Sequence, residues 1–136
     1  MTGERWKARA TALQALYEID TTRHETETVV SHILAKGELS EENNAFVSKL
    51  VSQVIKNKKE IDRYIQRFAT AWPIEQIPVI DRNILRLAIF EILFDNEVSV
   101  KVAINEAVEL AKKFGSDSSS KFVNGVLGSV NAFAER

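Results

Sequence analysis

Apolar residues recur every three or four positions along most of the chain, and this period predicts a series of amphipathic helices. The apolar stripes of the expected helices fall within Ala8–Ile19, Val29–Leu34, Val47–Ile55, Ile61–Phe68, Ile84–Phe94, Ala103–Phe114 and Phe122–Phe133. Ser40 and Ser99 are suitable N-caps. Gly37 and Gly115 are natural helix stops. Because no segment has the sustained alternation typical of a strand, we expect an all-α domain of about seven helices.

The segment Ile80–Phe94 is the one around which the other helices are expected to pack. From Ile84 to Phe94, only Arg86 and Glu91 are not apolar. A helix that is apolar nearly all round must be enclosed by protein, and this one is shorter than the ~20 apolar residues needed to span a membrane. The sequence therefore predicts a central buried helix.

The whole chain of 136 residues fits a single domain. Pro73 disfavours helical geometry at the preceding residue, so the fourth helix is expected to end at about Trp72. The linker Pro73–Pro78 is the only plausible internal boundary. It would separate an N-terminal helical half, residues 1–72, from a C-terminal half, residues 78–136.

Composition narrows the function classes. The absence of cysteine excludes disulfides and thiolate sites. His24 and His32 lack the spacing of a zinc-binding helix, so no metal site is expected. The N-terminus has no apolar run, which predicts no signal peptide and a cytoplasmic protein. Because the net charge is only −1, any binding of a polyanion must come from a local patch.

No residue pattern predicts catalysis. Glu106 and Glu109 lie on the polar face of an amphipathic helix, where nothing predicts the burial that raises a carboxyl pKa for acid–base work. Ser118, Ser119 and Ser120 are linked to no histidine. The string from Gly115 to Lys121 lacks the second glycine of a phosphate-binding loop. We therefore expect neither an enzyme nor a cofactor.

A small basic cluster lies near the start of the first helix. Arg5 and Arg9 project onto or beside the apolar stripe, Lys7 points elsewhere, and Trp6 lies between them. One interpretation is a set of solvated charges at a frayed helix end. The other is a phosphate clamp with an aromatic side chain that could stack on a base.

A second candidate lies before the last helix. Free backbone donors at a helix N-terminus bind anions, and Ser118–Ser120 add hydroxyl groups while Lys121 adds charge. The alternative is a simple helix cap. Phe122 could fill the core or face RNA, and we predict the stacking role.

Gly125 and Gly128 inside the same helix suggest close helix–helix packing, since glycine costs ~1 kcal/mol there relative to alanine.

Two C-terminal blocks, KVAINEAVELAKKFG (Lys101–Gly115) and KFVNGVL (Lys121–Leu127), resemble the signature of the NusB family. The upstream strings ARATALQALYEID (Ala8–Asp20) and ILRLAIFEIL (Ile84–Leu93) match as well, so the resemblance covers about residues 5–133. It implies a NusB-like fold of two roughly perpendicular three-helix bundles. It also implies no enzymatic activity.

The resemblance further implies a bacterial transcription antitermination factor. Such a factor binds the boxA element of ribosomal RNA operon transcripts together with NusE, which is also a small-subunit ribosomal protein. The complex modifies elongating RNA polymerase so that it reads through terminators. The family fold implies that the two RNA-contacting ends of the chain lie together.

Carried over residue by residue, the family's N-terminal arginine-rich run matches Arg5, Lys7 and Arg9, interrupted here by Trp6. The RNA-contacting turn before the last helix matches Ser118, Ser119, Ser120, Lys121 and Phe122. Many family members have a basic residue in place of Trp6 and an acidic one in place of Ser118.

The segment that faces NusE in the family matches Asp81 and Arg82, and we expect Asp81 at the exposed start of the central helix. Two other hypotheses remain open. The first is an RNA-binding module related to that of ribosomal RNA methyltransferases, which the end of the chain at Arg136, with no glycine-rich cofactor domain, disfavours. The second is a structural dimerisation module. The resemblance leaves both a monomer and a homodimer open.

Overall fold

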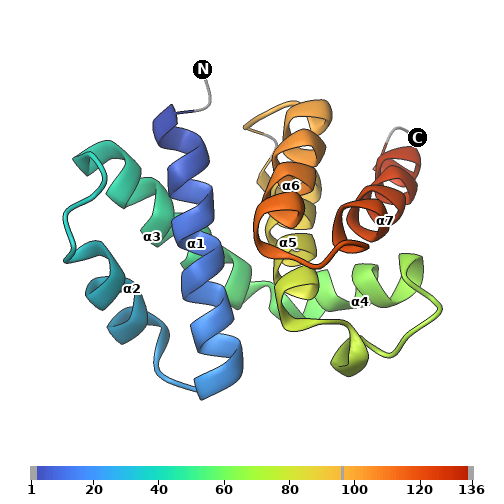
Figure 1. The fold of residues 1–136 in the computed structure, drawn as a ribbon, viewed down its shortest axis with the longest axis horizontal. Coiled ribbons are helices and arrows are strands. Elements are labelled where there is room, and N and C mark those ends of the chain that lie inside the picture. The colour runs from blue at the N-terminus through green and yellow to red at the C-terminus, as the bar shows by residue number, and fades with distance from the viewer. Residues whose placement is uncertain (1–2, 96, 135–136) are drawn as a thin grey trace. The chain divides into compact units, whose positions relative to one another are not determined.

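A computed structural model describes residues 3–95 and 97–134, and the regular elements of that part of the chain are all helical (Figure 1). The α-helices are α1 (Gly3–Thr22), α2 (Thr26–Leu34), α3 (Glu41–Lys56), α4 (Lys58–Phe68), α5 (Val79–Ile89), α6 (Val100–Phe114) and α7 (Ser119–Ala134). A short 3-10 helix, Ile74–Gln76, precedes α5, and a π-helical segment, Phe90–Asp95, continues it. The predicted all-α fold of about seven helices is confirmed.

The chain divides into two compact units, Met1–Lys56 and Asn57–Arg136. This division precedes α4, whereas the sequence suggested a boundary at Pro73–Pro78. The reason is that α4 packs against α5 and α7 and so belongs with the C-terminal helices. The Pro73–Pro78 linker therefore lies inside the second unit.

The first unit contains α1, α2 and α3, with α1 packed against both of the others. Its buried apolar residues are Ala8, Ala12, Leu13, Ala15, Leu16, Val29, Val30, Ile33, Val47, Leu50, Val51 and Val54. Two local predictions are confirmed. The Ser40 hydroxyl accepts a hydrogen bond from the Asn43 amide at 3.2 Å and caps α3. Gly37 has a φ of +70°, the left-handed conformation that ends a helix.

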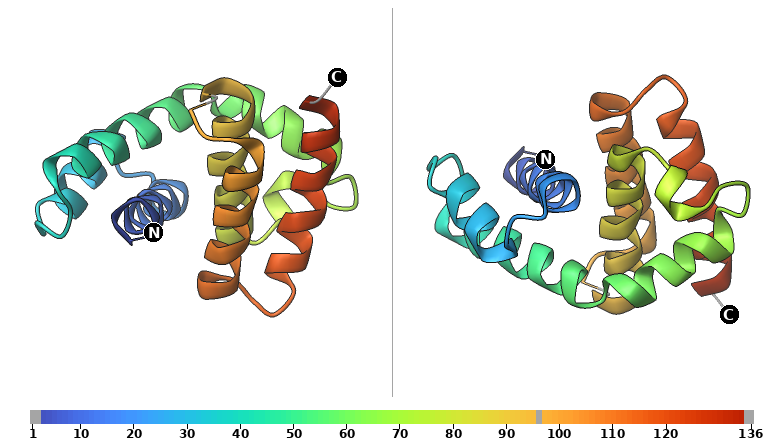
Figure 2. Two further views of the ribbon diagram at one scale, coloured as in Figure 1. Left: turned by 90° about the horizontal axis from the view of Figure 1, so that it is seen from above. Right: turned by 90° about the horizontal axis from the view of Figure 1, so that it is seen from below.

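The second unit is built around α5, which packs against α4, α6 and α7 (Figure 2). Residues 83–92 are all buried, and they include both charged side chains of the segment, Arg86 and Glu91. The predicted central buried helix is confirmed. Its helical geometry changes from α to π after Ile89.

A buried cation joins α4 to α5. The Arg86 side chain is 6% exposed, and its Nε and Nη2 donate to the two carboxylate oxygens of Asp62 at 2.8 and 3.0 Å. Its Nη1 donates to Asn83 Oδ1 at 3.0 Å. Two parallel bonds to one carboxylate make this pair directional as well as attractive.

Helix α4 ends at Phe68, so the predicted end at Trp72 is wrong. The Gln66 side chain explains the early stop. Its Nε2 donates to the Trp72 carbonyl at 2.9 Å, and its Oε1 accepts from the Ile74 amide at 3.0 Å. These two bonds give the Trp72 carbonyl and the Ile74 amide hydrogen-bond partners. The two groups therefore do not need a further turn of helix to be satisfied.

The glycines of α7 do not mark a close helix contact. A Cβ at Gly125 or Gly128 would have no heavy atom within 4 Å, and both residues are exposed. The prediction of tight helix–helix packing at these positions is therefore wrong. The buried face of α7 is formed by Val123, Val126, Leu127 and Val130.

Candidate nucleic-acid interface

Two arginines of the N-terminal cluster face α3 within the first unit. The guanidinium carbon of Arg5 lies 4.0 Å from the centroid of the Phe46 ring, and that of Arg9 lies 5.4 Å from it. Arg5 also contacts the Glu42 carboxylate at 3.6 Å. Arg9 is only 4% exposed. Both interpretations of the cluster, solvated charges and a phosphate clamp, require exposed cations and are therefore wrong for Arg9, which packs against the Phe46 ring.

The exposed part of this cluster is small. Lys7 is exposed, and Trp6 is half-buried. The start of α1 is fixed by Glu4, whose carboxylate accepts from Asn43 Nδ2 at 2.9 Å and from the Ser40 amide at 3.4 Å. The hydrogen bonds from Asn43 and Ser40 hold the pKa of Glu4 below its ordinary value. The backbone that presents Lys7 is thus tied to the start of α3.

The turn that contains Ser118, Ser119 and Ser120 is fixed by the buried hydroxyl of Ser119. Ser119 is 1% exposed, and its hydroxyl donates to Asp81 Oδ1 at 2.7 Å. The same hydroxyl accepts from the Ser116 amide at 2.9 Å. By contrast, Ser118 and Lys121 are exposed, and Ser120 is half-buried. Of the predicted turn residues, Ser119 therefore positions the others.

Asp81 is buried at the start of α5, so its predicted exposure is wrong. It is 4% exposed, and its contact with Ser119 joins α5 to α7. Burial raises the pKa of the Asp81 carboxyl, and the hydrogen bond from Ser119 partly opposes this rise. Sequence reasoning missed the contact because the two residues are far apart along the chain.

Replacing Asp81 by asparagine should stabilise the protein at neutral pH. Because its pKa is raised above the ordinary 3.8, the folded state holds this proton to higher pH than the unfolded chain, and stability falls as pH rises through that range. Asp81→Asn removes the charge and keeps an oxygen that accepts from Ser119. We expect a higher midpoint of thermal unfolding at about pH 7 and little change at about pH 3. A change of the same size at both pH values would contradict this assignment.

A hollow lies beside the first turn of α7. Its lining residues are Trp72, Gln76, Ile77, Pro78, Asp81, Ser118 and Phe122. Trp72 is 53% exposed, and Phe122 is half-buried. Two aromatic side chains thus border one open hollow that also has polar groups, a combination suited to an unpaired base. The sequence pattern does not predict a role for Trp72, because this residue belongs to no apolar stripe and only marks a possible helix end before Pro73.

Comparison with known proteins decides the family. A sequence model of the NusB family matches residues 6–132. The chain belongs to the NusB family. The transcription antitermination protein NusB of Dehalococcoides mccartyi strain CBDB1 is 55% identical over 131 residues, 96% of this chain and 92% of the relative. That of Bacillus licheniformis is 41% identical over 132 residues, 97% of this chain and 99% of the relative.

Solved structures agree with this family. T. maritima NusB has a TM-score of 0.89 at 31% identity, covering 97% of this chain and 93% of that one. A chain in the crystal structure of antitermination factors NusB and NusE in complex with dsRNA has a TM-score of 0.88 at 26% identity. The match covers 98% of this chain and 99% of that one. The predicted NusB-like fold is therefore confirmed.

Arg82, the second residue that the sequence predicts to contact NusE, is half-buried. Its Nη1 donates to the carbonyls of Ile74, Glu75 and Ile77 at 3.5, 3.3 and 3.4 Å. These bonds hold the 3-10 helix against the start of α5. Its cation therefore stabilises the loop that carries Trp72.

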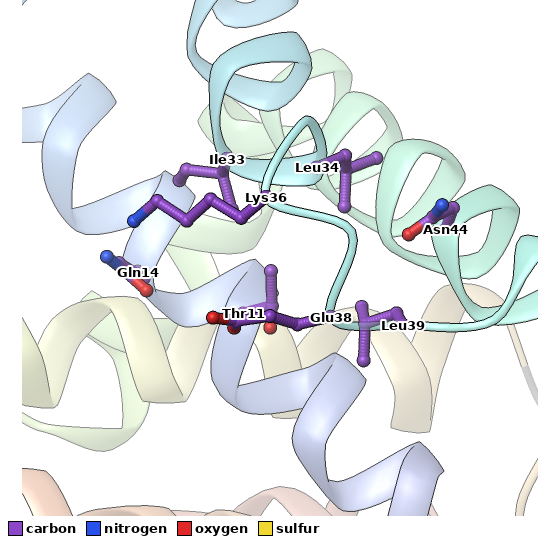
Figure 3. Close-up of a pocket in the computed structure, with 8 residues that line it drawn as sticks. All are labelled: Thr11, Gln14, Ile33, Leu34, Lys36, Glu38, Leu39 and Asn44. Atoms are coloured by element: carbon purple, nitrogen blue, oxygen red, sulfur yellow. The ribbon is translucent and has the colours of Figure 1, made fainter.

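Within residues 3–95 and 97–134, no group of three or more acidic, histidine or cysteine side chains could hold a metal ion. A cavity in the first unit has a volume of about 30 Å³, room for one water molecule (Figure 3). In the same part of the chain, no helix combines the length and the apolar character needed to cross a bilayer.

Proposed function

We propose that the protein is a transcription antitermination factor that binds the boxA element of ribosomal RNA operon transcripts together with NusE. In that role it helps RNA polymerase read through terminators. The observation that carries this proposal is the likeness, over 98% of the chain, to a chain crystallised among NusB, NusE and dsRNA. Because such a factor acts on a nascent transcript, we assign it to the cytoplasm.

The RNA contact in the second unit is proposed at the Ser118–Phe122 turn. Lys121 is exposed and supplies positive charge at the start of α7, where backbone donors already favour an anion. Phe122 and Trp72 line the same hollow and offer ring faces to an unpaired base. Ser119 serves this contact indirectly, because its buried hydroxyl fixes the turn to Asp81.

In the first unit, the proposed RNA contacts are the more exposed residues of the N-terminal cluster. Lys7 is exposed, and the Arg5 side chain is 41% exposed, so both cations can reach a phosphate. Trp6 is half-buried and can add a stacking contact. The buried Arg9 is proposed to support these residues through Phe46 rather than to contact RNA itself.

The NusE contact is proposed at the start of α5, around Asp81 and Arg82. Neither side chain projects freely, because Asp81 is bound by Ser119 and Arg82 by three loop carbonyls. Both therefore shape the surface that NusE would meet. This segment borders the Ser118–Phe122 turn through the Asp81–Ser119 bond, so RNA and NusE would bind next to each other.

Phe122→Ala should weaken RNA binding with little effect on folding. Loss of a stacking platform is expected to cost ~1–3 kcal/mol of affinity, whereas truncation of a fully buried phenylalanine would cost ~3–5 kcal/mol of stability. The half-buried position of Phe122 at the hollow favours the first result. The measurement is the affinity for a boxA-containing RNA, with and without NusE, together with the denaturant midpoint.

Phe133→Ala is the matched control. Phe133 is also a half-buried phenylalanine of α7, but it packs against Tyr64 and Phe68, with ring centroids 5.7 Å apart in each pair. This control should lower the denaturant midpoint and leave the RNA affinity of the folded protein unchanged. If Phe122→Ala behaves like Phe133→Ala, the ring belongs to the core and the proposed RNA contact is wrong.

A further inference from the structure

A polar groove lies between α6 and α7, which pack side by side in the second unit (Figure 2). It is lined by Asn105, Val108, Glu109, Lys112, Ser120, Lys121 and Asn124. Ser120 and Lys121 face this groove, whereas Ser118 and Phe122 line the Trp72 hollow. The groove and the hollow therefore lie on two sides of the first turn of α7. An RNA strand bound in the hollow would therefore enter the groove if it continued past Lys121.

The groove offers binding groups that the fold does not use. Within residues 3–95 and 97–134, the side chains of Asn105, Ser120 and Asn124 make no hydrogen bond. Lys112 Nζ contacts Glu109 Oε2 at 3.5 Å, but the two side chains are 60% and 58% exposed. An exposed pair of this kind contributes little to stability. The Lys112 ammonium can therefore exchange this carboxylate for a phosphate.

Gly125 leaves the surface of α7 beside the groove without a side chain. It is exposed, and a Cβ added to it would have no heavy atom within 4 Å. A glycine inside a helix is less favourable than alanine by ~1 kcal/mol, and no contact within the second unit requires it. Next to Asn124 and Lys121, the bare backbone allows close approach of a bound chain.

The lining chemistry favours nucleic acid over protein. The cores of protein–protein interfaces are enriched in aromatic residues, methionine and arginine, and the groove is lined by none of them. Ammonium groups instead suit phosphates. Side-chain amides suit the donor and acceptor edges of bases, which are accessible in single-stranded RNA.

We propose that the α6–α7 groove binds single-stranded RNA that continues past the Phe122 hollow, with Lys112 on a phosphate and Asn124 on a base edge. This inference rests on the proposed RNA-binding function and lengthens its footprint. It assigns part of the polar face of α6 to the RNA.

The test compares a minimal boxA RNA with RNAs extended at the 5′ or the 3′ end, all in the presence of NusE. The extension at one end should raise the affinity of the unmodified protein. Lys112→Gln should remove this gain and reduce the log–log salt slope for the extended RNA by about 0.7, the value for one phosphate contact on a single strand. Asn124→Ala should remove any preference among bases at one position of the extension.

Lys113→Gln is the matched control, since Lys113 is adjacent to Lys112 but lies outside the groove, with its Nζ 5.9 Å from the Phe114 ring centroid. It should retain the gain from the extension. Equal behaviour of the two lysine variants would overturn the groove assignment while RNA binding through Phe122 stands. Loss of NusE affinity in Lys112→Gln without RNA would also overturn it and make the groove a protein surface. If no RNA binds the unmodified protein, the proposed function itself fails.

Discussion

Arg86→Ala is expected to destabilise the protein by about 3–5 kcal/mol, the usual result of removing one partner of a buried ion pair. The variant would leave the Asp62 carboxylate, which is 22% exposed, without its two hydrogen bonds from the guanidinium. It would also leave Asn83 Oδ1 without its bond from Arg86 Nη1. Urea unfolding followed by circular dichroism would measure the change.

Two further variants separate this pair from general effects of mutation. Arg63→Ala removes a cation from the exposed face of α4 and should change stability by no more than about 0.5 kcal/mol. The double variant Arg86→Met with Asp62→Leu should recover much of the loss, because well-packed apolar residues often replace a buried ion pair at little cost. A loss below about 1 kcal/mol in Arg86→Ala would mean that water solvates Asp62 in the folded state.

Local patterns in the sequence predict most of the fold. The N-cap at Ser99 accepts from the Val102 amide at 3.1 Å, as expected for that residue type. The nearly all-apolar run up to Phe94 predicts burial of α5, because such a helix has no face for water. Both signals act within a few residues. They can therefore be recognised without knowledge of the tertiary structure.

The errors arise where a side chain forms a hydrogen bond outside its own turn of helix. Pro73 suggests a helix as far as Trp72, but the Gln66 amide bonds the loop and α4 ends at Phe68. The start of a helix is usually a favourable, solvated place for a carboxylate, yet Ser119 of α7 covers Asp81. The Gln66 bonds span six and eight residues and the Ser119 bond spans 38, and the hydrophobic period reveals neither.

The same distinction applies to the candidate site. The residue types at Lys121 and Phe122 could be recognised from a single turn followed by a helix. The hollow next to them could not, because Trp72 comes from the loop before α5. In the first unit, the aromatic partner of Arg5 and Arg9 is Phe46, which lies on another helix.

Gly115→Ala is expected to disturb the turn before α7 and destabilise the second unit. Gly115 has an extended backbone with φ −93°, so its role is one of space and not of a left-handed conformation. An added Cβ would meet both the Oγ and the Cβ of Ser119, and it would lie 2.8 Å from the Ala111 carbonyl oxygen. Because the Ala111 contact is with backbone, a rotamer change alone cannot relieve it. Overpacking of this kind costs about 1–3 kcal/mol.

The displacement of Ser119 adds a second loss, because Asp81 would then be buried without its hydrogen bond, at ~1–3 kcal/mol. This second part depends on the charge of Asp81. It should therefore be larger at about pH 7 than at about pH 3, where the carboxyl is protonated in both states and only a neutral group loses its hydrogen bond. The double variant Gly115→Ala with Asp81→Asn should show a loss that is the same at both pH values, because asparagine at this position carries no charge to titrate. Urea midpoints of the single and double variants at the two pH values measure this. A loss in Gly115→Ala that does not change with pH would show that Ser119 keeps its bond to Asp81 and that strain alone is responsible.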